Sequence, residues 1–399
     1  MSHSQILHLD LDAFLVAVER KYDPSLRGRA LVIGGQPTGW GRVVAMSEEA
    51  ARRGVKLGLS LAVAASRCPE AVFLDGAFDR YLDQSAAIDE ILREPGVPVE
   101  WTSIDSVFLD LTGSAARLGP ARKVAERIQA ALREDLHFDA SCGLASTKIA
   151  AQVASGLARP RGLLCVLPGY EERFLASLDV HVLPDLPPGA TVKLHQAGVI
   201  TLADLARMPL DTAEEILGRR FREFLHLARG LDERVVDGTA PPRSMAREIT
   251  LPSPTDDPDA LEAATQYLTE TLASRLRRMG CFAHTVTLRV RSSSADRSQA
   301  RSTTLREGTA IDSDLVAAAQ ALLRVIRRSC RGITGVSVVL SNLQNGGAQM
   351  PLFPLSTQTS AGVSTGTDRW ASLRGRAGFR ALVSGRFLDS QVARTRKAG

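Results

Sequence analysis

Hydrophobic and polar positions alternate strictly near the start of the chain. Between Ile6 and Asp12 a leucine stands at every second position, while His8, Asp10 and Asp12 occupy the positions between them. Because side chains of a strand point to alternate faces, this pattern predicts a strand with its leucines toward the core. The same pattern places the two carboxylates side by side on the opposite face.

A second run of strand-forming residues, from Trp101 to Thr112, carries Asp105 in its middle. If the two strands are neighbours, Asp10 and Asp105 could hold a hard divalent cation such as Mg²⁺, which prefers oxygen ligands and a substrate phosphate. That arrangement would suit phosphoryl-transfer chemistry. Aspartate is also common in turns at strand ends, and an Asp-X-Asp pair often marks a solvated sheet edge, so spacing alone leaves both interpretations open.

The pattern changes along the chain. Up to about residue 168, short strands mix with amphipathic helices, which indicates an α/β or α+β core. From 169 to 236 the pattern is typical of many short helices. Residues 237–246 have the composition of a linker, and residues 247–343 show the pattern of a small α+β domain. Residues 344–399 form a tail rich in glycine, serine and threonine.

The composition is that of an ordinary globular protein of several domains, with 399 residues, 44% of them hydrophobic and 23% charged. No apolar run approaches the length of a membrane span and no secretory signal is evident, so we expect a cytoplasmic protein without a membrane partner. The five cysteines form no Cys-X-X-Cys pair, and the histidines are scattered. This spacing argues against a transition-metal site or a disulfide framework.

The positive charge is concentrated in one region. The net charge of +5 is modest, but residues 275–306 contain eight arginines and a single acid. Alternation there predicts a strand on which Arg289 and Arg291 share one face, and Arg297 and Arg301 follow in the same region. Such a cluster is often no more than a solvated face, but a sheet with an arginine face also suits a nucleic-acid backbone.

Six runs, taken in order, resemble the Y-family of DinB-like translesion DNA polymerases over nearly the whole chain. They lie at residues 8–19, 23–28, 103–113, 158–162, 227–232 and 335–343. The resemblance implies an α+β multidomain fold like a right hand, with a palm of mixed sheet and helices. The implied parts are palm and fingers over 1–168 (fingers about 20–76), a helical thumb over 169–236, a linker over 237–246, a little finger over 247–343 and a flexible tail over 344–399.

The same resemblance implies a catalytic site. Asp10, Asp105 and the backbone carbonyl of Leu11 would hold two Mg²⁺ ions, with Mn²⁺ as an alternative, that activate a primer 3′-hydroxyl and steady the pyrophosphate. Arg159, where the family usually has lysine, would contact the incoming triphosphate and offers a fork suited to phosphate. Phe14 and Leu15 would also contact the nucleotide. Leu15 stands at the aromatic position that screens out the ribose 2′-hydroxyl, so we expect looser discrimination against ribonucleotides. Leu15 also fits a plain core position.

Three further positions depart from the family pattern. Ser106 replaces the third catalytic carboxylate, Glu48 replaces a tyrosine that contacts the triphosphate, and Ala51 replaces an arginine that does the same. Losing one charged contact to phosphate costs about 1.5 to 3 kcal/mol. We therefore expect poor nucleotide affinity.

Two other stretches bear on partners. Leu186-Pro-Pro-Gly-Ala190 replaces a glycine-rich thumb hairpin that meets a DNA phosphate, and its prolines remove two N–H donors. Gln349, Leu352 and Phe353 resemble the short motif with which bacterial polymerases dock on the sliding clamp. Five-residue patterns also arise by chance, so this motif is a hypothesis.

Two functions from different classes remain. The first is a template-directed polymerase that extends a primer-template or damaged DNA with altered nucleotide selectivity. The second is a non-catalytic adaptor that binds DNA and the clamp, similar in role to the ImuB-type subunits of a mutagenic repair assembly, with a replicative-type polymerase or another subunit as partner. A nuclease using the same acids has little support, because no further acid or base motif appears.

Overall fold

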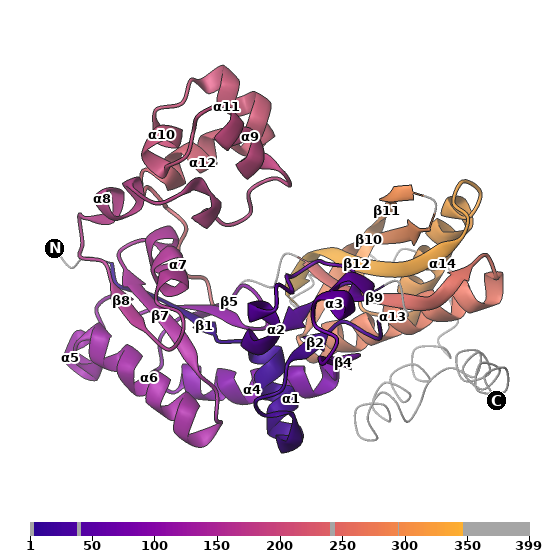
Figure 1. Cartoon of the computed structure of the whole chain (residues 1–399), viewed down its shortest axis with the longest axis horizontal. Helices are drawn as coiled ribbons and strands as arrows, with labels where there is room; N and C mark the ends of the chain where they lie inside the picture. The colour runs from indigo at the N-terminus through magenta and orange to yellow at the C-terminus, as the bar shows by residue number, and fades with distance from the viewer. Residues whose placement is uncertain (1–3, 38–40, 240–243, 294, 346–399) are drawn as a thin grey trace, which may run out of the picture. The chain divides into compact units, whose positions relative to one another are not determined.

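The computed structural model describes residues 4–37, 41–239, 244–293 and 295–345 (Figure 1). Within these ranges the chain divides into two compact units. Of the described residues, the first unit comprises 4–33, 45–53 and 74–239, and the second comprises 34–37, 41–44, 54–73, 244–293 and 295–345. Among the described residues, no helix combines the length and the apolar character needed to cross a bilayer. The predicted domain boundaries stay a prediction.

The first unit is built on a five-stranded sheet of order β5-β6-β1-β7-β8. Its strands are β1 (Ile6–Leu11), β5 (Val99–Trp101), β6 (Ser106–Asp110), β7 (Ala140–Ala145) and β8 (Leu163–Cys165). All neighbours are antiparallel except β7 and β8, which run parallel. The strand predicted at the start of the chain is therefore present, and its leucines are 0 to 2% exposed.

The second predicted strand is not continuous, which corrects the expectation for residues 101–112. Strand β5 ends at Trp101 and β6 begins at Ser106, so the run forms a hairpin rather than one strand. The amides of Thr102 and Ser103 both donate to the carbonyl of Ser106 and close the turn. Asp105 therefore lies at the end of the turn, directly before β6, and not in the middle of a strand.

Helices cover both faces of this sheet. They are α1 (Phe14–Tyr22), α4 (Phe78–Arg93), α5 (Ala115–Leu118), α6 (Ala121–Asp135) and α7 (Lys148–Leu157). The β1 leucines share one core with α1, α4 and α6, while Ile6 and Phe108 share another with α7. Helix α7 lies close to β7 because Gly143 has no side chain: a Cβ there would be 2.0 Å from the carbonyl oxygen of Ala151.

Shorter elements complete the part before the hairpin. Between α1 and α4 the chain forms η1 (Pro24–Leu26), β2 (Leu31–Ile33), β3 (Ala45–Met46), α2 (Glu48–Arg52), α3 (Leu61–Arg67) and β4 (Val72–Leu74). Strands β2 and β3 pair antiparallel. Ser47 and Ser60 cap α2 and α3, because each hydroxyl accepts a backbone N–H of the first turn.

A group of short helices follows β8. They are α8 (Glu171–Ala176), η2 (Val180–Val182), α9 (Ala190–Gln196), α10 (Leu202–Ala206), α11 (Leu210–Leu217), η3 (Gly218–Arg220) and α12 (Phe221–Ala228). Their apolar faces form one core, and Ile149 and Val153 of α7 belong to it. This core therefore ties the helical segment to the five-stranded sheet.

The second unit contains a four-stranded antiparallel sheet of order β11-β10-β12-β9. Its elements are β9 (Ser244–Thr255), α13 (Pro258–Arg278), β10 (Cys281–Ser292), β11 (Ala295–Thr309), α14 (Asp312–Ile326) and β12 (Ile333–Asn345). Side chains of one sheet face form a core with α13 and α14. Each unit thus combines sheet and helices, which confirms the predicted α+β multidomain class.

Candidate functional site

The sheet of the first unit brings the predicted acidic residues together at one end. Strands β1 and β6 are neighbours, as expected, and Asp10 stands opposite Ser106 in their register. The amide of Leu11 donates to the carbonyl of Asp105 at 2.8 Å. Asp10, Leu11 and Asp105 therefore meet at the end of β1, although they come from segments almost a hundred residues apart.

Asp10 forms an ion pair with Arg159. The aspartate is 8% exposed as a residue, whereas the Arg159 side chain is half-exposed. Partial burial lowers the pKa of Arg159 below its usual value, but a guanidinium keeps its charge in proteins. The cation predicted to contact a triphosphate thus lies beside the carboxylate predicted to bind metal.

Asp105 is half-buried, and the hydroxyl of Ser103 donates a hydrogen bond to its Oδ1. This bond between two side chains of the turn restricts the rotation of the Asp105 carboxylate. The hairpin explains the position of Asp105, because the turn between β5 and β6 places this residue beside the end of β1.

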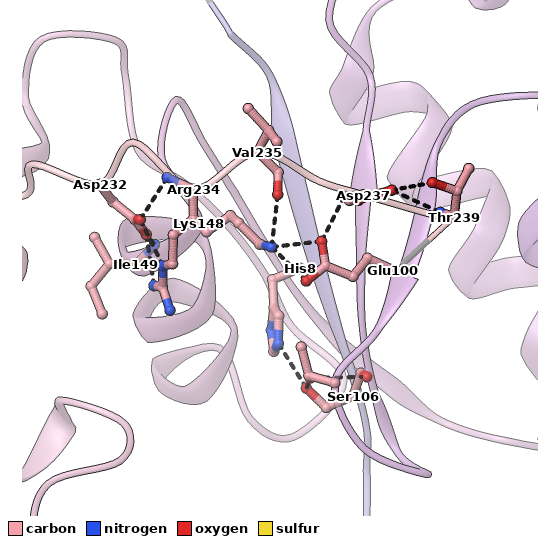
Figure 2. Close-up of polar contacts among 11 residues, drawn as sticks. His8, Glu100, Ser106, Lys148, Ile149, Asp232, Arg234, Val235, Asp237 and Thr239 are labelled. Atoms are coloured by element: carbon pink, nitrogen blue, oxygen red, sulfur yellow. Dashed lines mark hydrogen bonds and ion pairs between the residues drawn. The ribbon is translucent and has the colours of Figure 1, made fainter. Parts of the chain in front are cut away.

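Ser106, at the position where the resemblance implies a third carboxylate, forms a hydrogen bond with a histidine (Figure 2). Nε2 of His8 lies 2.8 Å from Ser106 Oγ, and Nδ1 lies 2.6 Å from Ser155 Oγ. Burial, assisted by the charges of Arg159 and Lys148, lowers the pKa of His8 to about 3. His8 is therefore neutral at physiological pH and holds Ser106 without adding charge to the site.

Sequence reasoning missed a buried ion pair beside His8. Nζ of Lys148 lies 2.7 Å from both carboxylate oxygens of Glu100, and 3.1 Å from the carbonyl of Val235 (Figure 2). It also lies 4.8 Å from the ring of Phe108. Lys148 begins α7, directly after the Thr147 cap, where a lysine has the appearance of an ordinary surface residue. Only the folded chain shows that Lys148 connects Glu100 of β5 with Val235, in the segment before residue 240.

Asp12 does not join the acidic pair, although alternation predicts that it shares a face with Asp10. It lies beyond the end of β1, and both its carboxylate oxygens accept from the hydroxyl of Ser141, at 2.8 and 3.0 Å. Its Oδ2 also accepts the backbone N–H of Arg161 at 2.9 Å. Asp12 therefore contacts the turn that carries Arg159.

The oxygen donors at the end of β1 are of the type that suits a hard divalent cation, but they are fewer than the resemblance implies. Two carboxylates and the Leu11 carbonyl would leave coordination positions for water and phosphate, as Mg²⁺ prefers. Within the described ranges, no group of three or more His, Cys, Asp or Glu side chains is arranged to hold a metal ion. Asp10, Asp105 and the Leu11 carbonyl are the oxygen donors that would hold a Mg²⁺ or Mn²⁺ ion at this place.

The residues predicted to bind nucleotide fall into different environments. Glu48 is exposed and forms an ion pair with Arg52 of its own helix, and Ala51 is exposed beside it. Phe14 is 1% exposed and packs 5.5 Å from the ring of Phe138, so it is a core residue. Leu15 is partly buried against the same core, which agrees with the plainer interpretation of that position.

The arginines of the second unit do not share one face. Arg289 stands opposite Ala300 and Ser337, on the face away from the helices, and it is exposed. Arg291 lies on the same face but forms an ion pair with Glu248. Arg301 stands opposite Leu288, which is fully buried in the helix-covered core, so Arg301 belongs to the other face.

Some predicted residues cannot be placed. The side chain of Arg297 and all of Gln349, Leu352 and Phe353 lie outside the described residues. Their predicted roles in DNA and clamp binding therefore stay predictions.

Comparison with known proteins identifies the family. Residues 9–156 match the model of the impB/mucB/samB family, and residues 242–352 match the model of the C-terminal domain of that family. The chain is 37% identical over 291 residues to a DNA polymerase IV of Alkalilimnicola ehrlichii, which covers 73% of this chain and 82% of that protein. It is 33% identical to a DNA polymerase IV of Halorhodospira halophila, over 90% of this chain and all of that protein.

Solved structures agree on the fold. A chimaeric Y-family DNA polymerase covers 86% of this chain and 99% of its own length, with a TM-score of 0.71 and 22% identity. DinB from Sulfolobus solfataricus covers 84% of this chain and 98% of its own length, with a TM-score of 0.61 and 23% identity. Y-family DNA polymerases generally use divalent metal ions. From its sequence relatives and its fold together, this chain belongs to the impB/mucB/samB family of DinB-like, Y-family DNA polymerases.

Proposed function

We propose that the chain is a template-directed DNA polymerase that acts in translesion synthesis, with weakened selection and binding of the incoming nucleotide. The observation that carries this proposal is the meeting of Asp10, Leu11 and Asp105 at the end of β1. Oxygen donors at that place are what nucleotidyl transfer requires. A bound metal ion would supply the charge that activates the primer hydroxyl and steadies the pyrophosphate.

The other side chains of the site would bind and orient the substrate. Arg159 neutralises Asp10 in the structure, and its exposed guanidinium could turn to a triphosphate once another cation occupies that carboxylate. Ser106 offers a neutral oxygen where the family has a negative one, so the site holds its cation less tightly. His8 keeps Ser106 in place and, being neutral, neither repels a cation nor donates a proton to a leaving group.

DNA would bind along the face of the second sheet that carries Arg289. Among the similar solved structures are an insertion ternary complex and a post-insertion binary complex of the Dbh DNA polymerase. Damaged DNA or a primer-template is therefore the partner we propose. A sliding clamp that binds Gln349, Leu352 and Phe353, and a further polymerase of a repair assembly, are finer proposals that rest on the sequence motif.

A second candidate function has its own support. Ser106 is held by His8, Asp10 by Arg159 and Asp105 by Ser103, so each group at the end of β1 already has a partner within the protein. Such internal pairing would also suit an adaptor that kept the fold and lost the chemistry. This adaptor would bind DNA and the clamp while another polymerase extends the primer.

Primer extension by the purified protein separates the two functions. The assay uses a primer-template with deoxynucleotides or ribonucleotides, and either Mg²⁺ or Mn²⁺. We expect slow extension that Asp105→Ala abolishes, and faster extension by Ser106→Glu, because the added carboxylate strengthens cation binding. Ser177→Glu adds the same charge at an exposed position that follows α8, outside the site, and serves as the matched control.

A different result would favour the adaptor. If neither the natural chain nor Ser106→Glu extends the primer with either metal, while both still bind the primer-template, the polymerase proposal is wrong. Extension that persists in Asp105→Ala would point to a contaminating polymerase, and the proposal would fall in the same way.

A further inference from the structure

Asp12 is engaged by a tight turn that contains Arg159. Its Oδ2 accepts the N–H of Arg161 at 2.9 Å, and its Oδ1 accepts the hydroxyl of Ser141 at 2.8 Å. Oγ of Ser141 lies 3.0 Å from the same N–H, and Ser141 is 0% exposed. Both carboxylate oxygens of Asp12 therefore accept hydrogen bonds within the protein, one from Ser141 of β7 and one from Arg161 of the turn.

The far end of this turn is fixed to the sheet independently of Asp12. The amide of Gly162 donates to the carbonyl of Ala158 at 2.9 Å, and a Cβ on Gly162 would lie 2.2 Å from that oxygen. The carbonyl of Gly162 in turn accepts from the amide of Cys142 at 2.9 Å and from the side chain of Gln129 at 3.0 Å. This end of the turn is thus hydrogen-bonded to β7 and to α6.

The middle of the turn needs support of its own. Arg161 has a φ of +61°, in the left-handed region that costs a residue with a side chain on the order of 1 kcal/mol. The two acceptors on its N–H, from Asp12 and Ser141, hold it there. The Arg161 side chain also pairs with Asp139 at 3.0 Å.

Arg159 stands two residues before this point, with its guanidinium on Asp10. Its side chain is half-exposed, so its direction depends on the backbone that carries it. A loose turn would let the guanidinium swing into solvent, because a long flexible side chain gains rotamer entropy there.

We propose that Asp12 is a positioning residue for Arg159: it holds the turn of residues 158–162, and through that turn it aims the guanidinium at the end of β1. The inference rests on the proposed function, in which Arg159 contacts the triphosphate. Asp12 itself touches neither the substrate nor a metal ion. This role differs from the metal-ligand role that an Asp-X-Asp pattern suggests.

The Asp12→Ala variant gives a clear test, because an effect of charge alone and a positioning role predict changes of opposite sign in triphosphate affinity. Removing a carboxylate close to a bound triphosphate removes repulsion, so Asp12→Ala would strengthen nucleotide binding if charge alone mattered. A positioning role predicts weaker binding. We expect Asp12→Ala to weaken binding of a fluorescent deoxynucleoside triphosphate about tenfold, as expected for one lost charged hydrogen bond.

The experiment is a double-mutant cycle on the full chain with Asp12→Ala, Arg159→Ala and the double variant. If Asp12 acts through Arg159, the double variant binds the triphosphate no more weakly than Arg159→Ala alone. Asp12→Asn keeps an acceptor oxygen and should recover most of the affinity. Amide exchange of residues 158–162 should rise in Asp12→Ala, and Mn²⁺ affinity measured by electron paramagnetic resonance should not fall.

Asp110→Ala is the matched control, because Asp110 accepts the N–H of Thr112 at 2.8 Å at the other end of β6. It should change neither triphosphate binding nor exchange at the turn. The proposal is overturned if exchange of residues 158–162 is the same in Asp12→Ala, if the two single effects add, or if Mn²⁺ affinity falls.

The proposed function can fail separately. If the natural chain binds no triphosphate with either metal, the polymerase proposal fails, and amide exchange together with Mn²⁺ affinity then decides the role of Asp12. Higher exchange without a loss of Mn²⁺ affinity supports the positioning role, and unchanged exchange or a lower Mn²⁺ affinity rejects it.

Discussion

At the scale of single residues, the candidate site is less charged than the family pattern. A hydroxyl stands where a third carboxylate is expected, and its partner His8 is neutral because it is buried between two cations. The remaining carboxylate of β1 is balanced by Arg159. The hydroxyl of Ser106 thus lies against a neutral histidine, and Asp10 lies against a cation.

Stability should depend on pH through His8. Its pKa is about 3 in the folded chain and near 6.5 when unfolded, so between these values only the unfolded chain takes up the proton. The free energy of unfolding must then fall as pH drops from about 6.5 toward 3, by on the order of 1 kcal/mol per pH unit. Urea unfolding at pH 7 and pH 5, in metal-free buffer, measures it.

The variant His8→Gln cannot titrate, so its stability should change less between pH 7 and pH 5 than that of the natural chain. His226→Gln, at an exposed position of α12, should show the same difference in stability between pH 7 and pH 5 as the natural chain. An equal pH response in the natural chain and in His8→Gln would show that His8 is not the source.

At the scale of elements, α7 supports the site by its closeness to the sheet. It crosses β7 at Gly143, and it supplies Ser155 to His8 and Lys148 to Glu100. A glycine in the middle of a strand weakens the strand by itself, so its presence indicates a close approach of another backbone. Here that backbone is the helix.

Gly143→Ala should destabilise the chain by about 2 to 3 kcal/mol, because its Cβ would lie 2.0 Å from the Ala151 oxygen and 2.4 Å from the Ser155 nitrogen. Gly156→Ala, on α7 with nothing within 4 Å, should instead stabilise it by up to about 1 kcal/mol. Chemical denaturation of the two variants checks the opposite signs. Equal changes in the free energy of unfolding for the two variants would mean that α7 does not pack closely against β7 at Gly143.

The segment that leaves the helical part is held to the sheet by a second set of contacts. Lys148 binds Glu100 and the carbonyl of Val235, and Asp232 accepts the amide of Ile149 at 2.9 Å (Figure 2). Asp232 also pairs with Arg234, and its side chain is 1% exposed. These bonds explain why the chain before residue 240 follows the sheet.

Lys148→Met should free this segment, because it leaves the partly buried Glu100 carboxylate without its cation. We expect faster trypsin cleavage after Arg234, followed over time by mass spectrometry. Lys123→Met, which removes a surface pair with Glu126 on α6, is the control and should cleave at the natural rate. If Arg234 is cut equally fast in all three proteins, the contacts of Lys148 do not hold the segment.

At the scale of the whole molecule, the charge of the second sheet is divided between two faces. Arg289 is exposed on the open face, Arg291 is partly neutralised by Glu248, and Arg301 lies on the face of the helices. A count of arginines along the sequence does not reveal this division. The surface proposed for DNA therefore depends mainly on Arg289 among these three.

Arg289→Ala should lower the salt dependence of DNA binding by about one unit in the slope of log K against log salt, for any sequence of the duplex. Arg301→Ala, the same change on the neighbouring strand, should lower it less. Fluorescence anisotropy with a primer-template at several salt concentrations measures both slopes. A larger effect of Arg301 would place the DNA on the other face of the sheet.

The sequence by itself determined the strand of Ile6–Leu11, the α+β class and the family, because these depend on local alternation and on runs of residues in order. The three departures that the resemblance implies at Ser106, Glu48 and Ala51 stay a prediction. The tertiary structure alone decided that Asp105 ends a hairpin turn and that His8 is neutral and bound to Ser106. It also decided that Asp12 accepts a hydrogen bond from the turn that carries Arg159. Each of these depends on partners from distant segments, whose packing fixes burial and hydrogen bonds that no local pattern contains.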